Sequence, residues 1–267
     1  MEELLRLYQI HSPIMNESKM VNYIVARLRN MGLTVKTDNI DNIYGVYGES
    51  DTYPCIVAHS DEVHFIKPKD FEIIQYKGNL FGFSESKKDF VGLGADDKNG
   101  IWIALKVAEQ FVRDKQPIKV AFFVAEEADC VGSGNSDLTF FKDCRFVLQF
   151  DRKGGSDFIN KANGLELNSK EFRRTAGKIY RRYGYKNARG YTTDVYKLKT
   201  MGLDISVANI SCGYYNAHTE KEMTNIKELK NALKMALELM NIKDRFPHTA
   251  KLPVQNPNEE NEDSFGN

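Results

Sequence analysis

Cysteine is scarce in this sequence and never occurs in the close pairs that bind structural zinc. The 267 residues include four cysteines, Cys55, Cys130, Cys144 and Cys212, and none forms a C-x-x-C motif with another. Zinc sites built on thiolates require such close spacing. We therefore expect reduced, mostly buried thiols, as in a cytoplasmic protein, and no metal site built on them.

Net charge and long apolar runs are also missing. Lysine and arginine together number 37, as do aspartate and glutamate, so no overall field favours nucleic acid or an anionic membrane. No apolar run approaches the roughly 18 residues of a membrane span. The acidic, amphipathic start M-E-E-L-L-R-L-Y lacks the basic and apolar regions of a signal peptide. We expect a cytoplasmic protein with neither a nucleic-acid nor a membrane partner.

No internal repeat and no Pro/Gly/Ser-rich linker divides the chain. Hydrophobic residues make up 42% and charged residues 28% of the sequence, an ordinary balance for a soluble globular protein. We predict a single domain over residues 1–250. The remaining residues, 251–267, are too polar to pack and are predicted to form a disordered acidic tail.

Short apolar runs alternate with helical periodicity along the chain. Helices are expected twice within 1–32, after the loop 92–98, near 194–201 and at 226–240; strands are expected within 33–47, at 54–58, in a hairpin at 71–83, and at 120–125, 146–150 and 205–210. This alternation predicts an α/β fold, a three-layer α-β-α sandwich around a mixed, mostly parallel sheet. Asn225 is expected to cap the last helix, with Glu228 completing a capping box.

Acidic and imidazole side chains occur where the predicted strands end. They are His59 and Asp61 after 54–58, Asp96-Asp97 where a glycine-containing loop opens a helix, Glu126-Glu127 after 120–125, Asp151 after 146–150, and His218 beyond 205–210. Each has an ordinary explanation alone: a solvated pair after an edge strand, a helix cap, or a hydrogen-bonded histidine. Ligands of α/β sheets bind at the carboxyl ends of strands, so their joint occurrence predicts a metal site.

The residue types narrow the kind of metal site. Histidine and carboxylate ligands without thiolates suit zinc, manganese or cobalt, typically in catalytic sites. More acids are present than a single tetrahedral ion with an open position needs. A two-metal centre uses them, with one carboxylate bridging ions about 3.5–4 Å apart.

The motifs resemble those of the co-catalytic zinc exopeptidases, a clan that includes leucyl aminopeptidase, tripeptidase T, glutamyl aminopeptidase and carboxypeptidase or deacylase relatives. The matching segments, in the family's order, are H-S-D (59–61), G-A-D-D-K-N-G (94–100), A-E-E (125–127), F-D (150–151) and H-T-E (218–220). The resemblance covers about residues 1–242. It implies a metallo-exopeptidase with two divalent ions, zinc or alternatively cobalt or manganese, which hydrolyses small peptides, most simply as an aminopeptidase.

The resemblance also implies a role for each motif residue. The metal ligands would be His59 and Asp151 on one ion, Glu127 and His218 on the other, and Asp96 bridging both, with a cis peptide bond after Asp96. Asp61 would hold the second ring nitrogen of His59. Glu126 would be the general base that takes a proton from water and passes it to the leaving amine.

Several alternatives stay open on the sequence. A carboxypeptidase or N-acyl amino-acid deacylase would share these motifs, and a basic rather than an acidic group at the substrate terminus would distinguish it. A non-catalytic binding protein could also retain the fold. Too few residues separate Asp151 from His218 for the lid or dimerisation domain of larger relatives.

Two further features have alternative interpretations. The basic segment 170–189 is either a flap over the site or a solvated face, and the solvated face is favoured. Tyr214 and Tyr215 line a specificity pocket or pack in the core.

Overall fold

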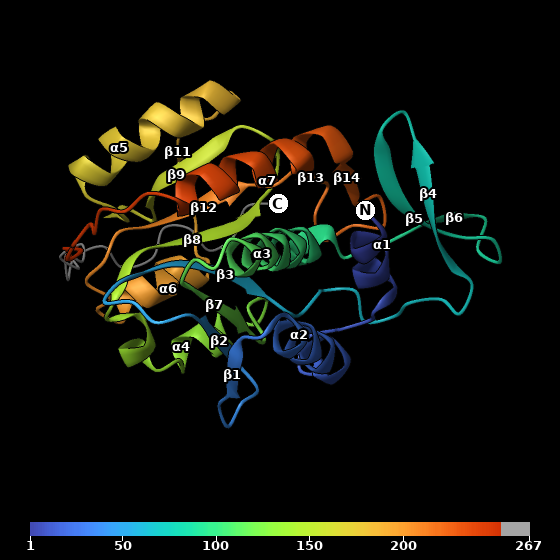
Figure 1. Ribbon diagram of the computed structural model, residues 1–267. Helices are drawn as coiled ribbons and strands as arrows, with labels where there is room; N and C mark the ends of the chain where they lie inside the picture. Colours follow the sequence, from blue (N-terminus) through green and yellow to red (C-terminus); the bar gives the residue numbers. More distant parts are fainter. Residues whose placement is uncertain (252–267) are drawn as a thin grey trace, which may run out of the picture.

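A sheet of nine strands runs through the molecule, with helices packed on both faces (Figure 1). The computed structural model describes residues 1–251, so the predicted tail lies, from residue 252 onward, outside the described residues. The strand order is β1-β2-β7-β3-β8-β12-β9-β10, and β11 pairs with β9. The bounds are β1 (Thr34–Thr37), β2 (Ile43–Tyr47), β3 (Tyr53–His59), β7 (Ile118–Phe123), β8 (Cys144–Arg152), β9 (Asp157–Ala162), β10 (Leu165–Glu166), β11 (Lys186–Gly190) and β12 (Val207–Ser211).

The centre of the sheet is parallel. Strands β7, β3, β8 and β12 are parallel neighbours, while antiparallel pairs join β1, β2 and β7 on one side and β12, β9 and β10 on the other. Every residue of β3, β7 and β12 is buried, as expected for parallel strands covered on both faces. The carboxyl ends of these strands meet at one edge, where ligand sites form in such sheets.

The helices form the two outer layers. Helices α1 (Glu2–Gln9), α2 (Ser18–Met31), α3 (Ala95–Arg113), α5 (Lys170–Tyr180) and α7 (Ile226–Met240) share one apolar core with the sheet. On the opposite face, α6 (Asp194–Thr200) packs on β8 and β12, and α4 (Val131–Gly134) packs on α6. Two 3-10 turns complete the set, η1 (Leu138–Phe141) and η2 (Arg181–Tyr183). The predicted α-β-α sandwich is confirmed. None of the helices in residues 1–251 has both the length and the apolar character to cross a bilayer.

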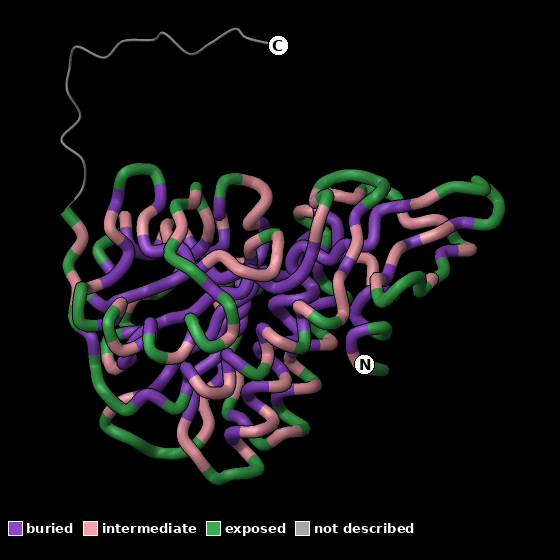
Figure 2. Tube along the Cα trace, turned by 90° about the horizontal axis from the view of Figure 1, so that it is seen from above, coloured by how far each residue is buried: buried purple, intermediate pink, exposed green. Residues whose placement is uncertain are grey.

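A second, smaller sheet projects from one side of the molecule. It contains β4 (Phe71–Tyr76), β5 (Asn79–Ser84), β6 (Asp89–Val91), β13 (Tyr214–Tyr215) and β14 (Met223–Asn225). The predicted hairpin at 71–83 is thus part of a larger unit, whose outer turns are exposed (Figure 2). Because β13 and β14 flank His218, this sheet helps to fix the segment that carries the second histidine.

The chain leaves the sheet earlier than predicted before the acid pair. Strand β7 ends at Phe123 instead of Ala125, and Ala125 has a φ of 48°. A positive φ is uncommon for a residue with a side chain, and here it turns the backbone before Glu126 and Glu127. The apolar pattern could not show this, because Val124 and Ala125 are buried like the strand before them.

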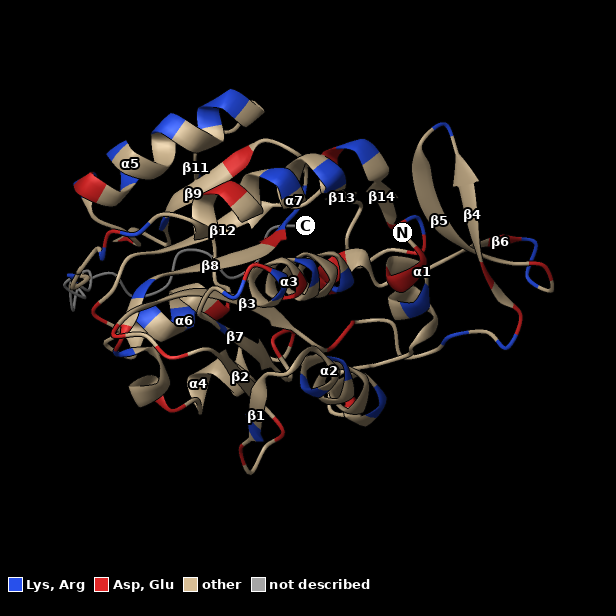
Figure 3. Cartoon of the chain, in the orientation of Figure 1, with Lys and Arg blue, Asp and Glu red and all other residues tan. Residues whose placement is uncertain are grey.

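The stretch 157–191, predicted only as polar and basic, contains the strands β9, β10 and β11, the helix α5 and the 3-10 turn η2. Strand β9 buries Phe158 and Ile159, and α5 buries Phe172 and Tyr180 against the core. Phe158 stacks on Tyr180 at a ring-centroid distance of 4.3 Å. The lysine and arginine residues of α5 lie on the outside of the molecule (Figure 3). The many basic residues made this stretch look solvated in the sequence, although α5 has a narrow apolar face that packs against the core.

The start of α7 shows one confirmed prediction and one wrong one. The Asn225 side chain accepts hydrogen bonds from the backbone N–H groups of Lys227 and Glu228, each at 3.1 Å, so it is the predicted N-cap. The prediction of a capping box is wrong. The Glu228 carboxylate accepts instead from the Tyr215 hydroxyl at 2.7 Å, and the Asn225 N–H donates to the Gly213 carbonyl.

Candidate metal centre

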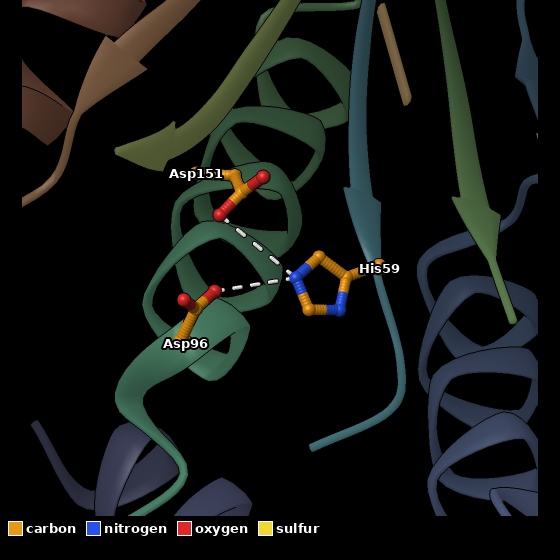
Figure 4. Close-up of side chains that lie close together, drawn as sticks. All are labelled: His59, Asp96 and Asp151. Atoms are coloured by element: carbon orange, nitrogen blue, oxygen red, sulfur yellow. Dashed lines mark hydrogen bonds and ion pairs between the residues drawn. The ribbon is translucent and has the colours of Figure 1, made fainter. Parts of the chain in front are cut away.

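Three elements bring His59, Asp96 and Asp151 together. His59 ends β3, Asp151 lies near the end of the adjacent parallel strand β8, and Asp96 lies in the first turn of α3. The His59 Nε2 atom is 3.2 Å from Asp96 Oδ1 and 3.8 Å from Asp151 Oδ1. Figure 4 shows both carboxylates directed at this one ring nitrogen. All three residues are buried, and together they present one nitrogen and two oxygen donors to a common point.

A second group of donors shares Asp96 with the first. The His218 Nε2 atom is 2.8 Å from Glu127 Oε1 and 3.5 Å from Asp96 Oδ2. The Asp96 carboxylate therefore turns one oxygen toward His59 and the other toward His218. All five predicted ligands lie at the same edge of the sheet, in two groups of three that overlap at this aspartate.

The backbone around Asp96 is held by buried acids. The peptide bond between Asp96 and Asp97 is cis, as the resemblance implies. The Asp97 carboxylate accepts hydrogen bonds from the N–H groups of His59 at 3.3 Å and Gly100 at 3.0 Å. It therefore joins the end of β3 to the start of α3, and this fixes the positions of His59 and Asp96 relative to each other.

Glu222 is a supporting residue that the sequence interpretation missed. Its buried carboxylate accepts hydrogen bonds from the N–H groups of Gly94, at 2.5 Å, and Asp96, at 3.1 Å. Glu220 likewise accepts from the Gly92 N–H at 2.8 Å. These acids join the segment after His218 to the loop before Asp96. In the sequence, the only sign of this role was the pair of glutamates in H-T-E-K-E (218–222). Such a charged segment usually lies in solvent, so the sign was not specific.

Replacing Glu222 with glutamine is expected to lower affinity for the divalent ion by about 10–100-fold, the usual cost of disturbing a partner that orients a ligand. The amide retains one acceptor oxygen but not the charge, so the Asp96 backbone would be held less firmly. Calorimetric titration of the metal-free protein with zinc measures this. Glu72→Gln, at an exposed residue of β4, is the control, and unchanged zinc affinity in Glu222→Gln would contradict the assignment.

Asp61 connects the first histidine to the acid pair. Its Oδ1 atom is 3.2 Å from His59 Nδ1, and its two oxygens accept from the N–H groups of Glu126 at 2.9 Å and Glu127 at 3.0 Å. Burial raises the pKa of Asp61, but His59 and these two amides lower it more, so the pKa lies below its usual range. The turn at Ala125 is what brings both amides to this carboxylate. Asp61 therefore orients His59 and the acid pair at once.

Burial and neighbouring charges shift the pKa values of Glu126 and His218. Burial raises the pKa of Glu126 well above its usual range, as do the charges of Asp151, Asp194 and Glu127, although His59 lowers it. Hydrogen bonds to Asp96 and Glu127 raise the pKa of His218 to about 10. Carboxylates outnumber imidazoles in this group. A set of nitrogen and oxygen donors of this composition fits divalent cations such as zinc, cobalt or manganese.

A further layer of side chains holds Asp151. The Gln149 amide donates to Asp151 Oδ2 at 3.2 Å and to Asp194 Oδ2 at 3.0 Å, while its carbonyl accepts from the Val195 N–H. The Tyr214 hydroxyl donates to Asp151 Oδ1 at 3.2 Å. Gln149 was missed by the sequence interpretation, although a glutamine within the buried run F-V-L-Q-F is the signal that could have identified it.

A cavity of about 360 Å³ opens beside these groups. Its lining includes Glu126, Tyr214 and the turn 190–193, together with apolar Ile159 and Leu167. Of the two tyrosines, only Tyr214 lines it. Residues 170–189 do not contribute to this lining, so the basic segment forms an outer face of the molecule, as favoured, and not a flap over the cavity.

Comparison with known proteins agrees with this geometry. The sequence profile described as Peptidase family M28 matches residues 42–240. The chain belongs to this family. Family membership confirms the resemblance to the co-catalytic zinc exopeptidases, and the matched range includes all five predicted ligands as well as Glu126 and Asp61.

Solved structures share the fold at low sequence identity. The aminopeptidase PepT from Bacillus cereus superposes with a TM-score of 0.72 at 12% identity, covering 90% of this chain and 96% of that one. A tripeptidase from Staphylococcus aureus gives 0.70 at 15%, covering 90% and 96%. The TET1 peptidase of Pyrococcus horikoshii gives 0.66 at 15%, covering 90% and 98%.

A curated relative matches part of the chain. Succinyl-diaminopimelate desuccinylase from Rickettsia typhi is 26% identical over 160 residues, which is 55% of this chain and 41% of that enzyme. The match therefore spans less than half of the relative's length.

Proposed function

We propose that this protein is a metal-dependent exopeptidase, an aminopeptidase that acts on short peptides with two divalent ions, zinc in the first instance. The observation that carries the proposal is the position of Asp96. Its two oxygens face two imidazoles, His59 and His218, each of which has a further carboxylate beside it. A single ion would not need both groups, whereas a pair of ions sharing Asp96 uses all five of these donors. Glu126 also lies within reach of His59 and Glu127 but is not needed as a ligand in this arrangement.

His59 and Asp151 would hold one ion and Glu127 and His218 the other, with Asp96 between them. When bound, such ions polarise a peptide carbonyl and lower the pKa of water. The chain itself supplies the proton transfer. Glu126 lines the cavity and is held at its N–H by Asp61, and its Oε1 atom accepts from the Cys130 thiol at 3.5 Å. We assign it as the base that takes the proton of the attacking water and returns it to the leaving amine.

Two broader parts of the proposal concern the setting of the site. We infer that residues 1–250 form a single catalytic domain, since every proposed ligand and supporting residue lies on the two sheets, on their helices or in the loops that join them. We also infer a cytoplasmic location, which is supported by the four buried cysteines, all of them free thiols.

The proposal is tested by cleavage of peptides with free or blocked ends. The metal-free protein is supplied with zinc, cobalt or manganese and offered leucine-initiated tripeptides with a free amino terminus, and the same peptides acetylated there. We expect cleavage of the free peptides only, and loss of all cleavage with a chelator. Release of the carboxyl-terminal residue from the acetylated peptides would favour a carboxypeptidase, and release of acetate would favour a deacylase. Absence of bound metal and of any cleavage would favour a binding protein.

A further inference from the structure

Arg152 and Lys153 lie between the metal centre and a second hollow. The cavity beside the proposed ligands is lined on one side by these two residues. A neighbouring hollow of about 520 Å³ is lined by the loop 154–157, by Ser211 and Tyr215, and again by Arg152 and Lys153. Ala217 also borders both. Arg152, Lys153 and Ala217 therefore form the border between the two hollows, and the first hollow contains the proposed metal ligands.

The cavity beside the metal centre is lined by charges of both signs. Glu126, Glu127 and Asp151 contribute acids to its lining, and Arg152 and Lys153 contribute basic groups. Arg152 pairs with Asp157, whose Oδ2 atom is 3.4 Å from Arg152 Nη2, a long contact for an ion pair. The Arg152 side chain is 22% exposed and lines the cavity. A guanidinium in such a position can donate to a carboxylate in two-point contact.

The backbone beneath these side chains is fixed. The Gly154 N–H donates to the Tyr214 carbonyl and the Gly213 N–H donates to the Gly154 carbonyl, both at 2.8 Å. The Ser211 hydroxyl donates to the Lys153 carbonyl at 2.8 Å. The loop after β8 is therefore tied to the segment that carries Tyr214, which contacts the proposed ligand Asp151. The basic pair is held at a constant position relative to the metal centre.

We propose that Arg152 and Lys153 form a subsite for the carboxyl terminus of the substrate, so that the preferred substrates are peptides of two or three residues. This inference rests on the proposed aminopeptidase function. Arg152 follows the proposed ligand Asp151 directly, and an extended peptide covers only about 3.5 Å per residue. A zwitterionic short peptide matches this cavity, with its amino group at the acids and its carboxylate at the basic pair. Ile159 and Leu167 in the inner cavity would contact an apolar first side chain.

The test compares leucyl-glycyl-glycine with its carboxyl-terminal amide in the zinc-loaded protein and in Arg152→Gln. The unmodified protein is expected to cleave the acid about 10–100-fold better than the amide in kcat/KM, the usual worth of a charge-assisted contact. Arg152→Gln should lose most of this difference through a higher KM for the acid, with the amide rate changed less than about 2-fold. Lys153→Gln should give a smaller loss. Arg174→Gln, at an exposed arginine of α5, is the matched control.

Other outcomes would overturn the subsite. Equal rates for acid and amide in the unmodified protein would show that the terminal carboxylate is not bound. If Arg152→Gln lowered cleavage of the acid and of the amide equally, Arg152 would support the structure of the site and would not bind the terminal carboxylate. A leucyl peptide amide that ends in glutamate separates the terminal carboxylate from a side-chain carboxylate, and preference for it over leucyl-glycyl-glycine would also contradict the proposal. No cleavage of any peptide would instead contradict the proposed function itself.

Discussion

Replacing Glu126 with glutamine is expected to lower kcat/KM by about 10³-fold, in the range that general-base catalysis contributes. Glutamine has nearly the same shape, so it can occupy the same position beside Asp61 and Cys130, but its amide cannot accept a proton. The bound metal should be unchanged, because Glu126 is not among the proposed ligands. The measurement is steady-state cleavage of a leucine-initiated tripeptide, together with the zinc content of the same preparation.

The metal content is what separates the base from a ligand. If Glu126→Gln lost both activity and zinc, the residue would be a ligand and the roles of Glu126 and Glu127 would be exchanged. Near-normal activity with normal zinc would leave the base unassigned. Glu49→Gln is the control, since Glu49 is exposed in the turn before β3, at the opposite edge of the sheet from the metal centre.

Much of the site could be predicted from two general rules: buried strands are recognisable by their length and composition, and parallel strands bring their carboxyl ends together. The runs before His59 and Asp151 have the length and composition of buried strands, and the carboxyl ends of parallel strands meet at one edge. Any ligands that follow such strands are close in space, whatever the details of the helices between them. The positions of these two residues therefore followed from local sequence alone.

The supporting residues could not be found in this way, because their roles depend on contacts between distant parts of the chain. Glu222 acts on the backbone of Asp96, 126 residues earlier, and nothing near Glu222 in the sequence indicates that partner. Asp61 reaches two amides only because Ala125 takes a positive φ, which its residue type does not favour. Such departures from local preference are expected where a structure serves a site.

The elements between 157 and 191 illustrate a different limit. Helix α5 buries an apolar stripe that includes Phe172 and Tyr180, but the arginines and lysines beside them dominate the average composition. Helical periodicity is reliable when the apolar face is wide. Here the face is narrow, since only four residues of α5 are buried, and they pack against the sheet and α7.

Replacing Asp96 with asparagine is expected to have an effect at least as large as the loss of the base. Asparagine keeps one oxygen donor but replaces the other with an amide nitrogen that cannot ligate a cation. Asp96 faces both His59 and His218, so the change would disturb both groups of ligands at once. Lewis-acid assistance is worth several kcal/mol, so the loss of kcat/KM should be about 10³-fold or more, with fewer than two bound ions per chain.

The decisive comparison is with His218→Ala. That change removes a donor from one group only, so the protein should retain about one tightly bound ion, whereas Asp96→Asn should weaken both. Metal content after extensive dialysis, measured by mass spectrometry, gives the stoichiometry, and Asp51→Asn, at an exposed residue before β3, controls for the loss of a surface charge. If Asp96→Asn kept two ions at unchanged affinity, Asp96 would not bridge the groups, because a shared carboxylate cannot lose one donor oxygen without affecting an ion on that side.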